Sequence, residues 1–330
     1  MKILFLVQGL DVAASRYRVL QYLPYLEEHG IRPTVSPFPV SFLEKLRVFK
    51  SVSKYDILFI QRKRFSVPWL KYLRKNARKI VYDFDDSVMC RNSKANRPES
   101  KTRNRMFRNM INASDHVIAG NEFLKENTAA FTDNITIIPS PIDMSLYRQK
   151  RYPGESNAVT LGWIGAHGSI HYLEKMKRIF ETLGKKHSNL RLKIVCDIFF
   201  DCENMAVEKK AWSKEDEAED LQSFDIGLMP LIDDPWSHGK CGLKILQCLA
   251  AGVPVVCSPY GINKEIVADG VHGFWAETPE EWIEKIEIMA NDHDLRKRMG
   301  MEGRKKVIEH YSLEANAPRI LKIFQQLTHS

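Results

Sequence analysis

Long apolar runs are missing from this sequence of 330 residues, and cysteine is scarce. The first apolar run, Ile3–Val7, is followed at once by Gln8 and Gly9. It is therefore too short for a membrane span or a secretory signal, and it fits a buried strand. The six cysteines form no CxxC pair and no spacing typical of a metal site. We expect a cytoplasmic protein with reduced thiols.

Motifs of three other functional classes are also missing. Gly9 stands alone after the first apolar run, where a nicotinamide-dependent oxidoreductase would carry GxGxxG. The second half has no DxD motif of the metal-dependent type, because Asp233-Asp234 is best interpreted as a turn. We therefore expect no metal and no other cofactor. RNP-like strands and helix-turn-helix spacing are absent from the sequence, which disfavours a nucleic-acid partner.

Positive charge, in contrast, is in excess, and it lies in the first half of the chain. The formal net charge is +8. Residues 1–150 contain 26 Lys and Arg against 14 Asp and Glu, a balance of +12, and the remainder contains 23 against 27, a balance of −4. This asymmetry predicts that the first half meets an anionic surface, either phospholipid or nucleic acid.

Two basic segments carry much of this charge. Arg62–Lys79 mixes cations with Phe65, Trp69 and Tyr72, a composition typical of peripheral docking on anionic lipid. Arg91–Arg108 has many cations and few apolar residues, so it could clamp a pyrophosphate or lie on lipid headgroups. The alternative is a solvated face whose aromatic side chains pack inward. We expect docking at the inner face of the cytoplasmic membrane, with Trp69 inserted.

Short apolar runs alternate with helical patterns, which predicts βαβ units and parallel sheets. The expected strands are Lys2–Gln8, Ile31–Pro37, Ile57–Gln61, Lys79–Asp83, His116–Ala119, Ile135–Pro139, Val159–Ile164, Leu192–Asp197, Ile226–Met229 and Val253–Ser258. One helix is expected over Ser15–His29 and a last one over Glu314–Thr328. The polar segment 148–157, which contains Pro153-Gly154, predicts a domain boundary.

The expected fold class is therefore α/β, with two doubly wound Rossmann-like domains facing a cleft. Residues 1–150 form the first domain and residues 151–330 form the second. The helix at 311–330 is expected to cross back and pack on the first domain. Ligands of such sheets bind beyond the carboxyl ends of the strands.

Three carboxylates, Asp83, Asp85 and Asp86, gather at the end of one expected strand. They could bind a divalent metal, hold a sugar hydroxyl or act as a base. Helix capping by Asp86 and ion pairs with nearby arginines are the structural alternatives.

A glycine-containing loop precedes a short helix within Asp233–Val256. A helix N-terminus presents free N–H groups and a positive dipole end, which suits a phosphate. Lys240 and Lys244 are expected to lie one helical turn apart, so that both cations face the same place. A solvated lysine pair on a connecting helix is the alternative.

The block 233–256 resembles the signature helix of the retaining GT-B glycosyltransferases of family 4, E-G-F-G-x-P-x-x-E-A-M-A-x-G-x-P-V-V. Further segments are similar to other motifs of that family and follow in the same order. They are Gly9 with Ser15-Arg16-Tyr17-Arg18 (the N-terminal glycine loop), Ser114–Ile118, Ile138–Asp143, Ser258–Val267, Asp269–Phe274 and Arg296–Tyr311. The resemblance spans the whole chain and implies the GT-B fold.

The resemblance also implies a function. A sugar would move from a nucleotide-diphosphate sugar to a hydroxyl of a lipid-linked or polysaccharide-precursor acceptor, in cell-envelope glycan synthesis. Asp85 and Asp86 would be the catalytic groups on the acceptor side, where Gly9, Ser15 and Arg16 form a loop. Lysines and helix N-termini would neutralise the leaving diphosphate without a metal. The expected donor-binding residues are Gly165, His167, Gly168, Ser169, Trp212, Gly239, Lys240, Gly242, Lys244 and Gln247, with Trp212 and Trp236 either stacking on the base or packing in a core.

The chain departs from the family pattern at three positions. The positions of the two signature glutamates are occupied here by Gly239 and Gln247. The amide of Gln247 can still bind a sugar hydroxyl, whereas Gly239 has no side chain that could take the role of the glutamate. The arginine expected after the first strand of the second domain is Ala166, with His167 as a partial replacement. These departures leave open a catalytically altered relative that binds sugar nucleotides, an epimerase or, outside the family, a nucleic-acid-binding protein.

Overall fold

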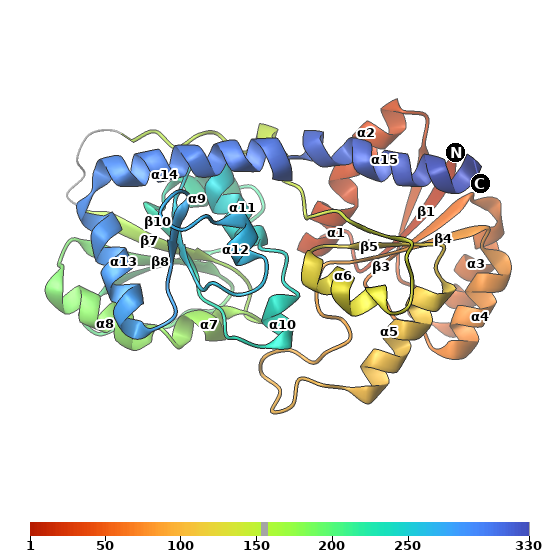
Figure 1. Ribbon diagram of the computed structural model, residues 1–330, viewed down its shortest axis with the longest axis horizontal. Helices are drawn as coiled ribbons and strands as arrows, with labels where there is room; N and C mark the ends of the chain where they lie inside the picture. Colours follow the sequence, from red (N-terminus) through yellow and green to blue (C-terminus); the bar gives the residue numbers. More distant parts are fainter. Residues whose placement is uncertain (153–157, 330) are drawn as a thin grey trace. The chain divides into compact units, whose positions relative to one another are not determined.

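The computed structural model describes residues 1–152 and 158–329, so part of the expected boundary segment, 153–157, lies outside the described residues. The chain divides into two compact units (Figure 1). The first comprises Met1–Pro141, Asp234–Cys241 and the residues from Leu313 onward, and the second comprises Ile142–Asp233 and Gly242–Ser312. The first unit thus ends before the expected boundary at residue 150. Lys150 belongs to the second unit, where its N–H donates to Ala251 O at 2.8 Å.

The first unit is built on a parallel sheet of six strands in the order β2-β1-β3-β4-β5-β6. These strands are β1 (Lys2–Val7), β2 (Arg32–Pro37), β3 (Ile57–Gln61), β4 (Lys79–Phe84), β5 (His116–Ala119) and β6 (Ile135–Ile137). The two prolines of β2 are tolerated because this strand lies at an edge of the sheet. The inner strands are buried on both faces, which explains their continuous apolar runs.

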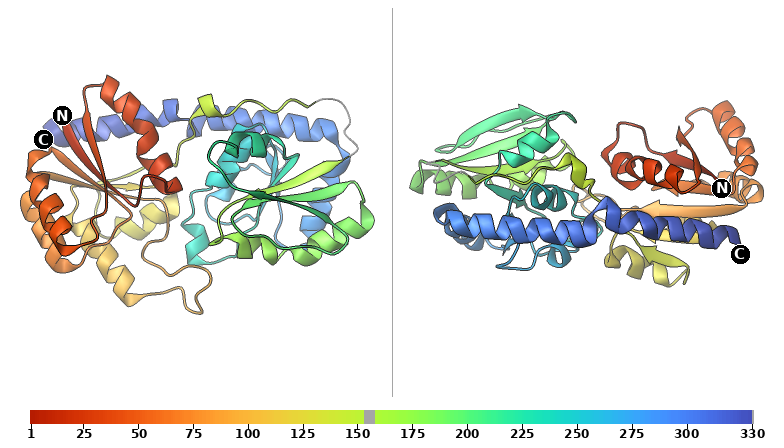
Figure 2. Two further views of the ribbon diagram at one scale, coloured as in Figure 1. Left: turned by 180° about the vertical axis from the view of Figure 1, so that it is seen from behind. Right: turned by 90° about the horizontal axis from the view of Figure 1, so that it is seen from above.

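Helices cover both faces of this sheet (Figure 2). The helices of this unit are α1 (Ala13–Arg18), α2 (Leu23–Glu28), α3 (Phe42–Ser51), α4 (Val67–Asn76), α5 (Lys101–Ala113), α6 (Glu122–Ala129), α10 (Pro235–His238) and α15 (Leu313–His329), with 3-10 turns η1 (Leu20–Tyr22) and η2 (Val52–Lys54). One core joins the sheet to η1 (Leu20–Tyr22), α2 and α15, where Phe324 packs on Phe5 and Phe59. The other core joins it to α3, α4 and α5. The last helix is thus part of the first unit.

The helix expected as one piece over Ser15–His29 is broken. The backbone leaves the helical region at Val19, and a 3-10 turn separates α1 from α2. Pro24 at the start of α2 has no N–H and would clash with the preceding turn of a continuous helix. The prediction of a single helix was therefore wrong at this proline.

The second unit contains another parallel sheet, in the order β12-β11-β10-β7-β8-β9. Its strands are β7 (Val159–Ile164), β8 (Leu190–Cys196), β9 (Ala206–Ala211), β10 (Ile226–Met229), β11 (Val255–Cys257) and β12 (Gly273–Trp275). Its helices are η3 (Met144–Leu146), α7 (Ile170–Glu174), α8 (Lys177–Lys186), α9 (Glu217–Gln222), α11 (Leu243–Ala250), α12 (Asn263–Ile266), α13 (Pro279–Asn291), α14 (His293–Lys306) and the π-helical η4 (Val307–Tyr311). Its core packs around Trp163, Phe180 and Trp282.

The two parallel sheets confirm the predicted α/β class, but two edge strands were not expected. β9 is polar and largely exposed, and β12 has only three residues. Neither shows the apolar run that marks an inner strand, because an edge strand has one neighbour and is open to water. No helix in the described ranges is both long and apolar enough to cross a membrane.

Candidate functional site

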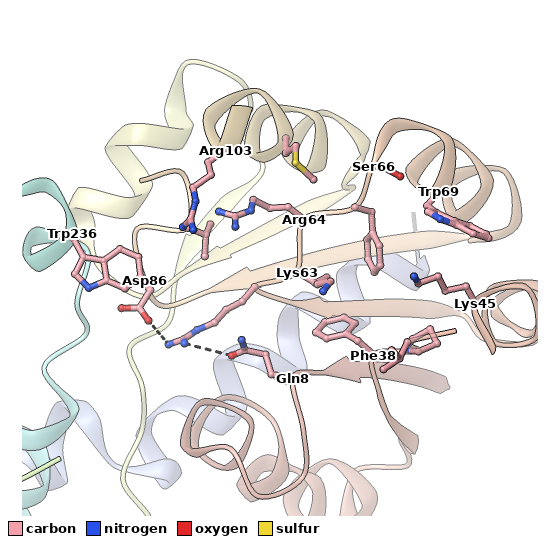
Figure 3. Close-up of a pocket in the computed structure, with 16 residues that line it drawn as sticks. Gln8, Phe38, Lys45, Lys63, Arg64, Ser66, Trp69, Asp86, Arg103 and Trp236 are labelled. Carbon is pink, nitrogen blue, oxygen red and sulfur yellow. Dashed lines mark hydrogen bonds and ion pairs between the residues drawn. The ribbon is translucent and has the colours of Figure 1, made fainter. Parts of the chain in front are cut away.

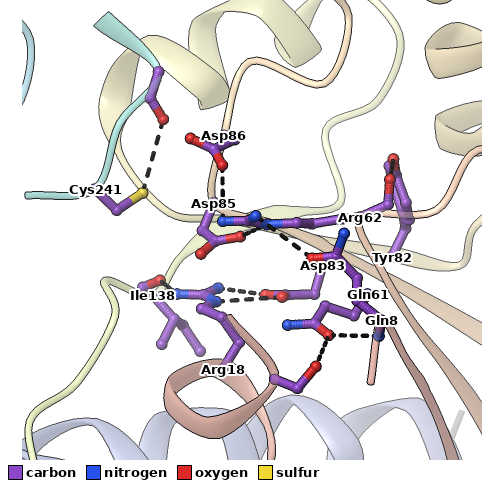
Figure 4. Close-up of polar contacts among 12 residues, drawn as sticks. Gln8, Arg18, Gln61, Arg62, Tyr82, Asp83, Asp85, Asp86, Ile138 and Cys241 are labelled. Carbon is purple, nitrogen blue, oxygen red and sulfur yellow. Dashed lines mark hydrogen bonds and ion pairs between the residues drawn. The ribbon is translucent and has the colours of Figure 1, made fainter. Parts of the chain in front are cut away.

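The acidic cluster of the first unit lies where two neighbouring parallel strands end. Gln61, the last residue of β3, pairs in register with Asp83 of β4. The residues that follow these strands, Arg62 on one and Asp85 and Asp86 on the other, therefore meet at the same edge of the sheet (Figure 4). The site is a product of strand order as well as of local sequence.

Arg62 ion-pairs with both catalytic candidates. Its Nε contacts Asp85 Oδ1, and its Nη2 lies 2.9 Å from Asp86 Oδ2. Its backbone has a φ of +56°, one of two positive values among the described non-glycine residues. Such a conformation is costly for a long side chain, and the bond from Arg62 N to Asp83 O, 2.7 Å long, helps to hold it.

The pKa values of the two aspartates are shifted in opposite directions. Burial alone would raise the pKa of Asp85, but the Arg62 guanidinium more than offsets it and the pKa lies below the usual range. Burial raises the pKa of Asp86, although Arg62 and Lys240 act in the opposite direction. Two adjacent carboxyl groups with pKa values pushed apart are a common arrangement for acid and base roles.

A second, fully buried ion pair lies beneath this cluster. Arg18 binds the carboxylate of Asp83 through two nitrogens, and its Nη1 donates to Ile138 O at 2.6 Å. The two side chains are 2% and 1% exposed. Both carboxylate oxygens of Asp83 are thus bound by Arg18. In the described residues no group of three His, Cys, Asp or Glu side chains is arranged to hold a metal ion.

The three N-terminal loop residues differ in burial, since Ser15 is buried and Gly9 and Arg16 are half-buried. Ser15 is completely buried, and its Oγ donates to Gln61 Oε1 at 3.0 Å. Because it is sealed in the core, Ser15 positions Gln61 and cannot reach an acceptor directly. Arg16 lies over the ring of Tyr17, with its Cζ 4.7 Å from the ring centroid. Gly9 lies in the loop between β1 and α1.

Gly239 and Lys240 belong to the first unit, whereas Lys244 belongs to the second. A side chain at position 239 would overlap Ser87 Oγ and lie 2.7 Å from Ser87 N, which explains why a glutamate is not accommodated there. Gly242, with a φ of +65°, caps α11 and starts it after Lys240. The expectation that Lys240 and Lys244 lie one turn apart on one helix was therefore wrong.

The first unit also contains a pocket of about 850 Å³. Its lining combines cations, aromatic rings and the carboxylate of Asp86 (Figure 3). The lining residues are Gln8, Phe38, Pro39, Val40, Lys45, Arg62, Lys63, Arg64, Phe65, Ser66, Trp69, Asp86, Val88, Arg103, Met106 and Trp236. Trp236 thus faces Asp86 and the pocket of the first unit, where its ring also contacts Lys240 Nζ at 5.7 Å.

The aromatic side chains of the segment 62–79 pack inward. Phe65 is 6% exposed, and Trp69 contacts Phe49 and Tyr72 at centroid distances of 5.4 and 6.3 Å. These rings belong to or pack on the core of the first unit. Trp69 is half-buried against this core, because helix α4 turns its apolar face toward the sheet, and its insertion into a membrane stays a prediction.

The second unit brings together three of the expected donor-binding residues. The loop after β7 runs from Gly165 to Ser169, and Lys244 Nζ donates to Ser169 Oγ at 3.0 Å. The same ammonium group lies 4.2 Å from the centroid of Trp163. A side-chain carbon at position 165 would lie 2.4 Å from a ring carbon of Trp163 and 2.7 Å from Lys244 Nζ, so glycine lets both side chains lie against this loop. The result is a cation at the N-terminus of α11, where helix N–H groups lack intrahelical partners.

His167 and Gly168 occupy the exposed part of this loop. His167 Nδ1 lies 2.6 Å from Asp197 Oδ2, and His167 N donates to Asp197 Oδ1 at 2.7 Å. These bonds from His167, with one from Cys196, lower the pKa of Asp197 to about 2. A side chain at Gly168 would meet no atom within 4 Å. The loop is anchored at His167 and open at Gly168.

Gln247 and Trp212 are linked through two residues that sequence patterns did not single out. Gln247 Nε2 donates to Tyr147 Oη at 3.2 Å, and Tyr147 Oη donates to Glu217 Oε1 at 3.3 Å. Trp212 Nε1 donates to Glu217 Oε2 at 3.0 Å, while the side chain stays 41% exposed. A buried carboxylate therefore lies in the network of Gln247, the position where the signature has its second glutamate.

Arg62 is the most informative residue that sequence analysis assigned elsewhere. Its cationic neighbours in the sequence predict a membrane-docking segment. Its position directly after β3 is the signal that could have found it, since the carboxyl ends of parallel strands share one edge. Glu217 gave no such signal, because its partner Tyr147 is 70 residues away in the sequence.

Comparison with known proteins gives a family match in the second unit. Residues 209–306 match the family model described as glycosyl transferases group 1. An uncharacterised glycosyltransferase of Methanocaldococcus jannaschii is 32% identical over 89 residues, which are 26% of this chain and 25% of that protein. Spore coat protein SA of Bacillus subtilis is 24% identical over 83 residues, 24% of this chain and 22% of that protein. The matches span about a quarter of the length of these relatives.

Solved structures match along nearly the whole chain. Sucrose-phosphate synthase from Thermosynechococcus elongatus has a TM-score of 0.78 and 14% identity, with 99% of both chains covered. HepE of Anabaena, solved with UDP and glucose, has a TM-score of 0.73 and 17% identity, covering 98% of this chain and 99% of that one. At these identities the similarity shows the fold. Residues 209–306 thus match the glycosyl transferases group 1 family, and the chain has the GT-B fold.

Proposed function

We propose that this chain is a retaining glycosyltransferase that moves a sugar from UDP-sugar to a hydroxyl group of a lipid-linked or polysaccharide-precursor acceptor. The observation that carries the proposal is the convergence of Lys244, the Gly165–Ser169 loop and the N-terminus of α11 in the second unit. A diphosphate is the ligand that such a set of donors and one cation suits. The presence of UDP in the similar HepE structure supports the choice of nucleotide.

Each unit carries one part of the chemistry in this proposal. The second unit would neutralise the leaving diphosphate through Lys244 and backbone N–H groups, and Trp212 would lie against the base. The first unit would hold the acceptor hydroxyl through Asp86, which lines its pocket. Arg62 and Asp85 would position Asp86, because all three form one ion-pair cluster.

Replacement of Lys244 by Ala tests the donor site. We expect UDP affinity to fall by about 1–3 kcal/mol, or roughly 5- to 150-fold in Kd, because a charge-assisted bond to the diphosphate is lost. Titration calorimetry with UDP measures this. Lys185→Ala removes an exposed lysine from α8 of the same unit and should leave the Kd unchanged. Equal UDP affinity in Lys244→Ala and the natural protein would refute the placement.

The acceptor side of the proposal includes docking on an anionic membrane from the cytoplasm. Exposed cations on α4 and α5 support it, among them Lys71, Lys75, Lys101 and Arg105. Each contributes about 1 kcal/mol near an anionic surface, and the attraction is screened by salt. Changing these four residues to Ser should weaken co-sedimentation with phosphatidylserine vesicles at least tenfold, with neutral vesicles as the control. Equal sedimentation with both kinds of vesicle would contradict docking by charge.

A further inference from the structure

The pocket of the first unit has a cationic end beside Asp86. Five of its lining residues are cationic, namely Lys45, Arg62, Lys63, Arg64 and Arg103, and one is anionic. The charge of Arg62 is balanced by Asp85 and Asp86. Arg64 and Arg103 form no ion pair within residues 1–152 and 158–329, so their charges remain uncompensated there.

These two arginines converge inside the pocket. Figure 3 shows the guanidinium groups of Arg64 and Arg103 pointing toward each other. Arg103 Nη1 donates to Cys90 O at 2.8 Å, whereas Arg64 Nη1 is buried and has no hydrogen-bond partner in the described part of the chain. Burial lowers the pKa of Arg64, and the neighbouring Arg103 lowers it further. An unbonded buried donor beside a like charge is costly unless an anion occupies the space between them.

The other end of the pocket is apolar and continues onto the surface. Phe38 and Phe65 lie 6.0 Å apart, and Trp69 contacts Phe42 at 5.4 Å. Phe42 is 64% exposed, and Val40, which lines the pocket, is 84% exposed. Exposed apolar side chains that continue a pocket lining typically mark a binding site for an apolar group.

We infer that this pocket binds the acceptor of the proposed transfer reaction, and that the acceptor is an amphiphile with a phosphate or diphosphate group. The anionic group would bind between Arg64 and Arg103, and a hydrocarbon chain would leave past Phe38, Trp69 and Val40. Guanidinium groups suit phosphate oxygens because they donate in a fixed fork. The volume of about 850 Å³ is within the range of sites for ligands of this size. Asp86 lines the same pocket, so the receiving hydroxyl would lie near the phosphate end.

Calorimetry with three probes tests this inference without requiring turnover. Farnesyl diphosphate carries both groups, inorganic pyrophosphate carries the anion alone, and farnesol carries the chain alone. All titrations use saturating UDP, so that the diphosphate site of the second unit is filled. We expect farnesyl diphosphate to bind at least tenfold more tightly than either of the other probes. Arg64→Gln should weaken its binding at least tenfold, and Lys54→Gln, which removes an exposed lysine outside the pocket lining, should not.

The outcomes separate this inference from the proposed function. Equal affinity for farnesyl diphosphate and pyrophosphate would show an anion site without a chain site and would overturn the inference. So would equal affinity for farnesyl diphosphate and farnesol, or unchanged binding in a folded Arg64→Gln variant. If Arg64→Gln does not fold, Arg103→Gln provides the same test. UDP binding that remains sensitive to Lys244 would leave the transferase proposal standing in each of these cases.

Discussion

Changing Asp86 to Asn should lower kcat by about 10²–10⁴-fold, the usual range for loss of a group that accepts a proton or hydrogen bond in the transition state. UDP affinity should stay unchanged, because Asp86 lies in the first unit and the proposed donor groups lie in the second. Initial rates with UDP-sugar and calorimetry with UDP measure the two quantities separately. A loss in kcat without a loss of donor binding is the result expected for a group that acts on the acceptor.

The pH dependence of the transfer rate provides an independent test of the role of Asp86. Burial raises the pKa of Asp86, and the carboxylate is the form that can accept from a hydroxyl. The rate should therefore fall as the pH drops through this pKa, with an acidic limb above the ordinary aspartate value of about 3.9. Lys240→Gln removes a cation that lowers this pKa, so it should move the limb to higher pH. Asp86→Asn should abolish the limb.

A carboxylate elsewhere in the first unit serves as the control. Asp133 is exposed and outside the cluster, so Asp133→Asn should change neither kcat nor the acidic limb. If Asp86→Asn retains full activity while folding normally, its carboxylate serves only the ion pair with Arg62. A limb that persists in Asp86→Asn would assign the titration to another group.

Replacing Asp83 by Ala should destabilise the first unit by about 3–5 kcal/mol, the cost of leaving one partner of a buried ion pair unpaired. Arg18 would then carry a charge that is 2% exposed to water, and it would keep its hydrogen bond to the carbonyl oxygen of Ile138. For a unit of this size the expected fall in Tm is roughly 6–20 °C. Scanning calorimetry measures this fall directly.

A double variant distinguishes the ion pair from simple packing. Arg18→Met with Asp83→Leu removes both charges and keeps apolar volume in the core. It should lose clearly less stability than Asp83→Ala, because no uncompensated charge remains. A loss of stability below about 1 kcal/mol in Asp83→Ala would match the small contribution of an exposed ion pair and would contradict this account. Equal losses in both variants would attribute the effect to packing.

Much of the donor side follows from local sequence. Gly165, Ser169 and Lys244 were expected to bind the same ligand, and the structure brings these three residues together. Their positions depend on short-range features, namely a loop after an apolar strand and the first turn of a helix. Lys240 did not follow, because Gly242 in a left-handed conformation precedes α11 and Lys240 therefore lies before the helix begins at Leu243.

The apolar runs of the inner strands and their alternation with helices are enough to predict two parallel sheets, because inner strands are buried on both faces and bear that pattern locally. The partners of the charged residues cannot be predicted in this way. Arg62 meets Asp85 and Asp86, and Glu217 meets Tyr147, only because the chain folds back in a particular order. Ion pairs and hydrogen bonds act over a few ångströms in space and leave no periodic trace in sequence. Only the tertiary structure therefore shows that the cations beside Asp86 line a pocket, and that the aromatic rings between them face the core.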